Sequence, residues 1–288
     1  MPHKQTNVPP RFSALAGWSA LTVEGVDAET FLQAQTMNDV RALAPGTWHW
    51  NGWLTPKGRV VALFALLRAG EDRFLLALPD FPADALRDAL RRYVFRSRVV
   101  LASDTWWQVA AGPPVEGSHG TVAAAVDGGW ALDAGGEGGA RTLRLLPAGA
   151  VAAPATPATD AAWRAADIAH GLPRLGPGQH EAWTPQMLSL ERLGAFSLKK
   201  GCYPGQEIVA RTHYLGQARR GLVRLRGEAL VEDAPVTAGE RDVGRLVCTT
   251  ADGTEALAVV AADAAGDLRV EDRAVTRLPL QDGLRRVT

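Results

Sequence analysis

The sequence has only two cysteines among its 288 residues, and it has no surplus of either charge. Cys202 and Cys248 stand far apart and form no CxxC pair, which argues against a disulfide framework and a cysteine-ligated zinc site and suits a reducing compartment. Lysine and arginine together number 31, as do aspartate and glutamate, so the chain as a whole offers no positive field to nucleic acid. Direct nucleic-acid binding is therefore not expected, and only a local basic patch would change this.

Long hydrophobic runs are missing as well. No apolar stretch reaches the roughly 18 residues that a membrane span requires, and the first residues, MPHKQTNVPPRF, contain no apolar signal-like segment. We therefore expect a cytoplasmic protein without membrane contact. Its composition, 47% hydrophobic and 22% charged, is typical of a globular chain, and its length allows two or three domains.

Several common catalytic and binding motifs are absent too. The glycine-rich DAGGEGGA (133–140) lacks the order of a dinucleotide fingerprint, and there is no phosphate-binding P-loop, HExxH or GxSxG. The six histidines are scattered. His180, beside Glu181 in a loop rich in proline and glycine, is interpreted as a solvated polar residue rather than a metal ligand. We predict no stable metal site.

The patterning up to residue 112 mixes strands and helices irregularly, which favours an α+β fold over a doubly wound sheet. An extended stretch is expected at 12–25, three strands within 47–80 and two more at 96–103 and 106–112. Helices are expected at 27–36 and 81–95.

The second half begins with two stretches that resemble domain boundaries, at 133–140 and at 146–162. The latter is rich in Ala, Pro and Thr and is interpreted as a linker or an exposed loop. Helices are expected at 163–171 and 185–194. From 221 onward, short apolar runs between Gly and Asp turns predict a small β-barrel or sandwich.

The stretch KKGCYPGQEIVARTHYLGQARRG (199–221) combines a cysteine, two lysines and a helix start. Pro204 suits the first helical position, which would place Cys202 just outside the helix N-terminus. Free backbone N–H groups and the nearby lysines would favour the thiolate there. A small buried cysteine with solvated lysines explains the same residues equally well. The motif has no partner histidine, which disfavours a Cys–His nucleophile.

The chain has nine tryptophans, which is many for its length. Most are expected to anchor cores or interfaces, because large aromatic rings dominate packing. One or two could instead stack on a flat heterocyclic ligand. The pattern alone does not select them.

The eight residues K-G-C-Y-x-G-Q-E at 200–207 resemble the signature of the YgfZ family of folate-binding proteins. These proteins are related to the glycine-cleavage aminomethyltransferase (T-protein) and are implicated in maintaining iron–sulfur enzymes. The resemblance covers nearly the whole chain. FLQAQTMNDV (31–40), LTPKGRV (54–60), GLP (171–173) and the block at 184–211 match further motifs of the family.

This resemblance implies an α+β, three-domain ring similar to T-protein, with a C-terminal β-barrel around a folate channel. The expected divisions are 1–145 for the first folate-binding region, 146–217 for the segment carrying the signature and 218–288 for the barrel. The implied cofactor is tetrahydrofolate or another folate, contacted by Trp18 and Trp163. The implied functional thiol is Cys202. The remaining motif residues are Lys200, Gly201, Tyr203, Gly205, Gln206, Glu207 and Arg211.

Three departures from the family pattern bear on activity. T-protein-like enzymes carry an Asp–Asp pair where this chain has Ala62 and Leu63, so no general base is expected there and aminomethyl transfer is disfavoured. The Glu that can pair with the pterin is replaced by Ala169, although the neighbouring His170 could partly substitute. Ala34 replaces a glycine of the Q-G-Q block, with no consequence that we can assign.

Our leading hypothesis is a folate-dependent accessory protein that supports iron–sulfur enzymes, including those that modify tRNA. The alternatives are a one-carbon transferase and a non-catalytic interaction protein that has lost its ligand. Cys202 would make a redox, sulfur or iron contact that is transient or shared, because a stable cluster needs more cysteines. Cys248 is interpreted as a buried apolar residue.

Overall fold

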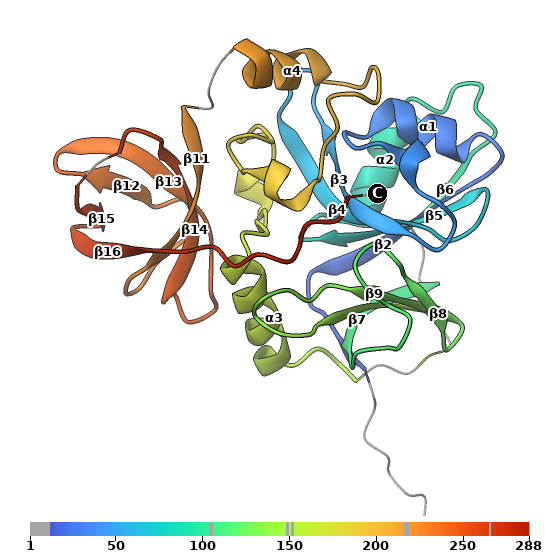
Figure 1. The fold of residues 1–288 in the computed structure, drawn as a ribbon, viewed down its shortest axis with the longest axis horizontal. Helices are drawn as coiled ribbons and strands as arrows, with labels where there is room; N and C mark the ends of the chain where they lie inside the picture. Colours follow the sequence, from blue (N-terminus) through green and yellow to red (C-terminus); the bar gives the residue numbers. More distant parts are fainter. Residues whose placement is uncertain are drawn as a thin grey trace, which may run out of the picture.

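The computed structural model describes residues 12–103, 106–147, 150, 153–215, 219–264 and 266–287. In this part of the chain the strands form two five-stranded sheets and a closed barrel of six strands (Figure 1). The fold is α+β, with the barrel at the C-terminal end, as the sequence predicted. None of the described helices is long and apolar enough to cross a membrane.

The first sheet is antiparallel and has the strand order β3-β4-β5-β2-β6. Its strands are β2 (Trp18–Glu24), β3 (Trp48–Leu54), β4 (Val60–Arg68), β5 (Arg73–Pro79) and β6 (Val100–Ala102). Helices α1 (Ala28–Gln35) and α2 (Ala83–Arg91) pack on one face through Phe31, Leu86 and Leu90. Strand β4 is almost continuously apolar because both of its faces are covered.

The second sheet packs against the other face of the first. Its order is β1-β7-β10-β9-β8, and one shared core contains Leu75 and Ala77 of β5 together with Val109 and Leu143. The strands are β1 (Ser13–Ala14), β7 (Trp107–Gly112), β8 (Ala124–Val126), β9 (Gly129–Asp133) and β10 (Thr142–Pro147). Of these strands, β7 was predicted from the sequence, whereas β8, β9 and β10 were not.

Two helix predictions in the second half need correction. Helix α3 (Pro157–Ala169) begins six residues before the expected start at 163, because Thr156 caps it by accepting from the Thr159 N–H at 3.1 Å and Pro157 occupies its first turn. The end of the presumed linker 146–162 is therefore helical, and residues 148–149 and 151–152 of that stretch lie outside the described part. The helix expected at 185–194 is only the short 3₁₀ turn η3 (Leu190–Leu193).

The C-terminal barrel closes in the order β11-β14-β13-β12-β15-β16. Its strands are β11 (Arg220–Arg226), β12 (Pro235–Ala238), β13 (Arg241–Thr249), β14 (Glu255–Ala261), β15 (Leu268–Val270) and β16 (Arg273–Leu278). All except β12 were expected from the alternation of apolar residues and turns. Its core is made largely of small and branched apolar residues such as Val236, Leu246 and Ala258.

After β16 the chain leaves the barrel and runs back to the first two sheets, as the red segment in Figure 1 shows. The Gln281 N–H donates to the Ala169 carbonyl at 2.9 Å, and the Arg286 N–H donates to the Leu193 carbonyl at 3.1 Å. The indole N–H of Trp50 donates to the Leu284 carbonyl at 3.0 Å. The tail therefore ties the barrel to α3 and to β3. The divisions expected at 145/146 and 217/218 stay predictions, and the first falls inside β10.

Candidate functional site

Two of the sequence motifs meet at a pair of glycines. The turn between β3 and β4 carries Gly58, and the signature loop carries Gly205, which has φ +82°. A Cβ on Gly205 would lie 2.6 Å from Gly58 Cα and 2.6 Å from the Thr55 carbonyl oxygen. Only glycine fits such a close approach at a positive φ. The signature loop is thus fixed against the LTPKGRV hairpin.

The signature helix α4 (Gln206–Leu215) starts two residues later than expected. Pro204 is therefore not its first residue but lies in a turn, in which the Gln206 N–H donates to the Tyr203 carbonyl at 3.1 Å. The reason is Gly205, whose left-handed φ breaks the helical path. Glu207 and Arg211 are exposed on the helix.

Lys200 points inward and links the signature loop to the FLQAQ block. Its ammonium donates to the Thr36 carbonyl, and its own carbonyl accepts from Gln33 Nε2 at 3.1 Å. The ammonium also lies 5.0 Å from the centroid of the Tyr203 ring, a cation–π contact. Burial lowers the Lys200 pKa to about 7. Tyr203 is buried too, and this burial raises its pKa.

A buried polar cluster that the sequence analysis missed lies next to Lys200. Asn51 Nδ2 donates to Thr36 Oγ1 at 3.1 Å and lies 3.2 Å from His49 Nε2, while Asn51 Oδ1 accepts from the Asn38 N–H at 2.9 Å. Because Asn51 Nδ2 is a donor, His49 Nε2 is the acceptor and the ring proton sits on Nδ1. Burial, and then the charge of Lys200, lowers the His49 pKa to about 3, so this imidazole is neutral.

A cavity of about 860 Å³ opens beside this cluster, within the size range of small-molecule sites. Asn38 and His49 form part of its wall. Lys199 lines it just before the signature, and His213 and Tyr214 line it from α4. Its other lining residues are Asp39, Ala42, Gln186, Glu191, Gly194, Phe196, Ser197, Leu198, Thr212, Arg285, Arg286 and Val287.

Cys202 is exposed on the signature loop and does not line the cavity, although Lys199 does. The two lysines expected to favour its thiolate behave differently, since Lys199 is exposed whereas the Lys200 ammonium is bonded to Thr36. Cys248 is fully buried in β13, as predicted for a small apolar residue. Its Sγ accepts from the Arg174 N–H at 3.5 Å, and burial raises its pKa to about 11.

The two tryptophans assigned to folate contact each other edge to face, with ring centroids 6.4 Å apart. Trp163 is buried in α3 and Trp18 is partly exposed at the start of β2. The Arg141 guanidinium lies 4.7 Å from the Trp163 ring centre, and that of Arg174 lies 5.5 Å from the Trp18 ring centre. Both indole N–H groups are buried without a partner among the described residues. Because the two rings meet edge to face, they do not form a parallel sandwich.

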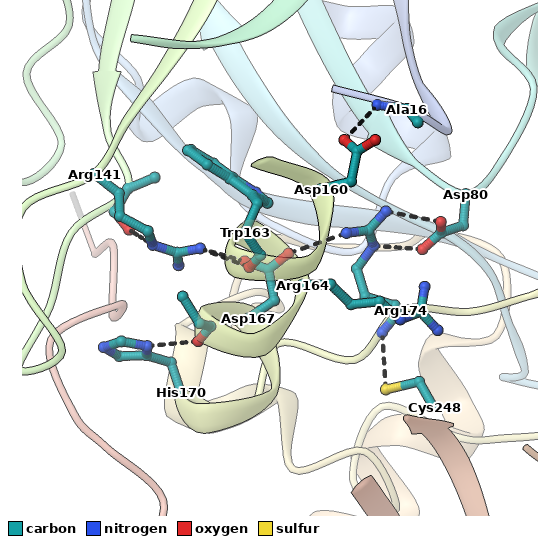
Figure 2. A network of polar contacts seen from close by, with 12 residues as sticks. Ala16, Asp80, Arg141, Asp160, Trp163, Arg164, Asp167, His170, Arg174 and Cys248 are labelled. Atoms are coloured by element: carbon teal, nitrogen blue, oxygen red, sulfur yellow. Dashed lines mark hydrogen bonds and ion pairs between the residues drawn. The ribbon is translucent and has the colours of Figure 1, made fainter. Parts of the chain in front are cut away.

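A buried ionic network lies beside both tryptophans, and Figure 2 shows it around Trp163. Asp167 is fully buried and accepts from Arg141 at 2.8 Å and from Arg174 at 3.2 Å. Arg174 also donates to both oxygens of Asp80, at 2.5 and 2.8 Å. A smaller cavity of about 280 Å³ adjoins the network and is lined by Trp18, Asp80 and Trp163, with Asp160, Arg164, Arg174 and residues 15–17.

Three of the four positions that depart from the family pattern are buried in the fold. Ala62 and Leu63 are buried in β4, and Ala169 is buried at the end of α3. His170 has both ring nitrogens engaged, since Nδ1 lies 2.7 Å from the Ala166 carbonyl and Nε2 accepts from the Gly138 N–H at 3.3 Å. It caps the helix against the glycine-rich loop. Ala34 is exposed on α1.

His180 and Glu181 are not part of a metal cluster in the described part of the chain, where no group of three or more ligating side chains is found. The His180 ring packs on Phe81 at 4.8 Å, and its Nε2 donates to the Leu175 carbonyl at 3.1 Å. Glu181 adopts φ +62°.

Two named relatives are similar to this sequence along most of its length. A tRNA-modifying protein YgfZ from Vibrio vulnificus (strain YJ016) is 30% identical, over 81% of this chain and 75% of that protein. The chain belongs to the YgfZ family. The tRNA-modifying protein YgfZ from Edwardsiella ictaluri (strain 93-146) is 29% identical, over 95% of this chain and 92% of its own length. No protein-family model matches the chain.

The fold of this YgfZ-family chain is shared with an enzyme of glycine cleavage. The crystal structure of the glycine cleavage system aminomethyltransferase T from Bartonella henselae superposes with a TM-score of 0.76, covering 96% of this chain and 86% of that enzyme. The two sequences are 17% identical. The likeness therefore establishes the architecture and not the reaction.

Proposed function

We propose that this chain is a folate-binding accessory protein that supports the assembly or repair of iron–sulfur enzymes, including those that modify tRNA. Its relatives are named tRNA-modifying proteins, and its fold is that of an aminomethyltransferase T. Tetrahydrofolate is the cofactor we expect. The partners are iron–sulfur client enzymes, in the cytoplasm.

The proposal rests on a difference between the residues of the signature, some of which make internal contacts while one is exposed. Lys200, Tyr203 and Gly205 are used for internal contacts that hold the loop, whereas Cys202 is exposed. The loop that carries the exposed thiol is therefore held on both sides of Cys202. Because the thiol stands alone, it would exchange sulfur, iron or electrons with a partner and would not hold a cluster by itself.

Aminomethyl transfer has less support. A general base must reach the proton that it removes. The positions where such a base is expected are Ala62 and Leu63, two apolar residues inside the first sheet. Neither can take a proton.

Two places in the structure are candidates for folate. The resemblance assigns Trp18 and Trp163, next to the cavity of about 280 Å³. The cavity of about 860 Å³ is the larger, and Phe196 and Tyr214 offer rings while Lys199 and Arg285 offer positive charge to carboxylates. We propose Trp18 and Trp163 as contacts, and the large cavity is the alternative that a titration must distinguish.

The thiol is tested by complementation of a bacterial strain that lacks its own family member. We expect C202A and C202S to fail and C248A to restore growth, with equal protein levels in all three. C248A is a matched control because it removes the other thiol, which is buried. Full rescue by C202A would remove Cys202 from the mechanism.

Folate binding is tested by isothermal titration with tetrahydrofolate. We expect the wild type to bind and W18A to weaken binding about tenfold, as for the loss of one aromatic contact. Weakening by Y214A but not by W18A would place the ligand in the large cavity. No heat with the wild type would leave the chain as an interaction protein without folate.

A further inference from the structure

A short segment between α2 and β6 departs from the neutral charge of the whole chain. Residues 91–100 read RRYVFRSRVV and contain four arginines and no acidic residue. We call this stretch the arginine segment. It begins at the last residue of α2 and ends at the first residue of β6, the edge strand of the first sheet.

The arginine segment exposes large apolar side chains. Phe95 is 88% exposed, Val100 67% and Tyr93 45%. The guanidinium of Arg96 lies 5.3 Å from the Phe95 ring centre, so an arginine and an aromatic face stand together at the surface. Three large apolar side chains and an arginine paired with an aromatic ring thus lie at the surface within one short segment.

The charge of the segment is only partly neutralised. Arg98 pairs with Asp27, with Nε 3.2 Å from Oδ2, and the Asp88 carboxylate pairs with Arg87. Among the residues that the structure describes, no carboxylate lies within 4.0 Å of the guanidinium groups of Arg91, Arg92 and Arg96. None of the three guanidinium groups is held in a direct ion pair with a described residue, although Arg91 lies near enough to Asp88 to help Arg87 lower the pKa of that carboxyl. All three can therefore reach an anionic partner.

The backbone of the segment is held in place. The Arg98 N–H donates to Asp27 Oδ2 at 2.7 Å, and the Ser97 N–H donates to the Val94 carbonyl at 2.7 Å. Gly25 lies so close that a Cβ on it would be 2.1 Å from the Arg98 carbonyl oxygen. The exposed side chains thus project from a fixed turn, and a partner would not have to order it.

The same features disfavour a membrane surface as the partner. An interfacial helix needs an apolar face that is free to enter lipid. The apolar side of α2, formed by Ala83, Leu86 and Leu90, is buried against the first sheet. An acidic protein surface would also pair with the arginines, but the Phe95 face beside Arg96 matches the stacking platform that single-stranded nucleic acid uses.

We propose that the arginine segment binds an unpaired stretch of RNA, with Arg91, Arg92 and Arg96 contacting phosphates and one base stacking on Phe95. Arginines along a backbone and an aromatic platform for bases are the two elements of single-strand recognition. This goes beyond the proposed function. The balanced net charge of the chain led us to expect no direct nucleic-acid binding, and the proposal reverses that expectation for this one surface. It requires neither folate nor Cys202.

The test is fluorescence anisotropy with fluorescein-labelled oligouridine at several salt concentrations. For three phosphate contacts on a single strand, we expect the slope of log Kobs against log [salt] to be about 2 units shallower in R91A/R92A/R96A than in the wild type. The matched control is R241A/R269A/R277A, which removes the same charge from exposed positions on the barrel. The barrel lies at the opposite end of the molecule from β6 in Figure 1, so this control should keep the wild-type slope.

A second variant separates stacking from charge. F95A should weaken oligouridine about tenfold, as for one lost base stack, and should leave binding of heparin, which has no bases, unchanged. Equal oligouridine affinity of F95A and wild type overturns the stacking role. The proposal fails altogether if the triple variant and the barrel control bind RNA alike, if phosphatidylserine vesicles or oligothymidine bind better than RNA, or if wild type shows no binding at low salt.

Discussion

Gly205 and Gly58 meet backbone to backbone, where the signature loop crosses the β3–β4 hairpin. G205A would add strain at φ +82° and a Cβ only 2.6 Å from Gly58 Cα. We expect G205A to lower the free energy of unfolding by at least about 2 kcal/mol. Urea denaturation gives this value from the shift in midpoint at constant m.

Gly201 provides the control for this experiment. It also has a positive φ, +94°, but a Cβ there would meet no atom within 4 Å. G201A should therefore show only the conformational strain, about 1–2 kcal/mol. If the two variants lose the same stability, the contact with Gly58 does not hold the loop.

The sequence was most informative where local pattern and tertiary environment agree. The apolar runs of β4 and β14 are buried strands, and the turns of the barrel follow Gly and Asp. Strands β8 and β9 were missed because they are short and lie near glycine-rich turns. Their strand conformation depends on pairing with neighbouring strands more than on their own composition.

The candidate site was predictable only in part. The signature itself revealed Cys202 and Lys200. The residues around His49 and Asp167 in the sequence do not indicate that each belongs to a buried polar group. Asp167 sits in an alanine-rich helix, and its arginine partners lie at 141 and 174. Such groups are assembled by the fold, and a buried charge with its partners is visible only once the chain is folded.

Lys200 should make stability depend on pH. Its pKa is about 7 in the folded protein and near 10.5 in the unfolded chain, so the unfolded chain binds more protons between these values. The contribution of this group to stability should therefore rise by a few kcal/mol at most as the pH increases from about 7 to about 10, and should stay constant below that range, where both states carry the proton. Urea titrations across this range measure the slope.

K200M should abolish that rise, because it removes the titrating group. K199M is the matched control, since Lys199 is its exposed neighbour and should leave the slope unchanged. An identical slope in K200M and wild type would mean that another group causes the pH dependence.

The two thiols should differ in reactivity. In the native protein, 5,5′-dithiobis(2-nitrobenzoate) should release one equivalent rapidly, because Cys202 is exposed while Cys248 is buried and its pKa is raised to about 11. In denaturant, both should react. Native C202A should show no rapid phase and native C248A one full equivalent, and a rapid phase in C202A would contradict the buried position of Cys248.

Asp167 should matter for stability more than any surface carboxylate. D167N keeps the shape of the side chain but leaves the guanidinium groups of Arg141 and Arg174 facing a neutral amide in a buried site (Figure 2). We expect a loss of about 3–5 kcal/mol in the free energy of unfolding, as for breaking a buried ion pair from one side. D263N, which removes the exposed partner of Arg241, should cost less than about 1 kcal/mol.

Because Arg141 lies over Trp163 and Arg174 lies over Trp18, D167N should also change tryptophan fluorescence in the native state, whereas D263N should not. A similar small loss in both variants would show that the network contributes little to the folded state.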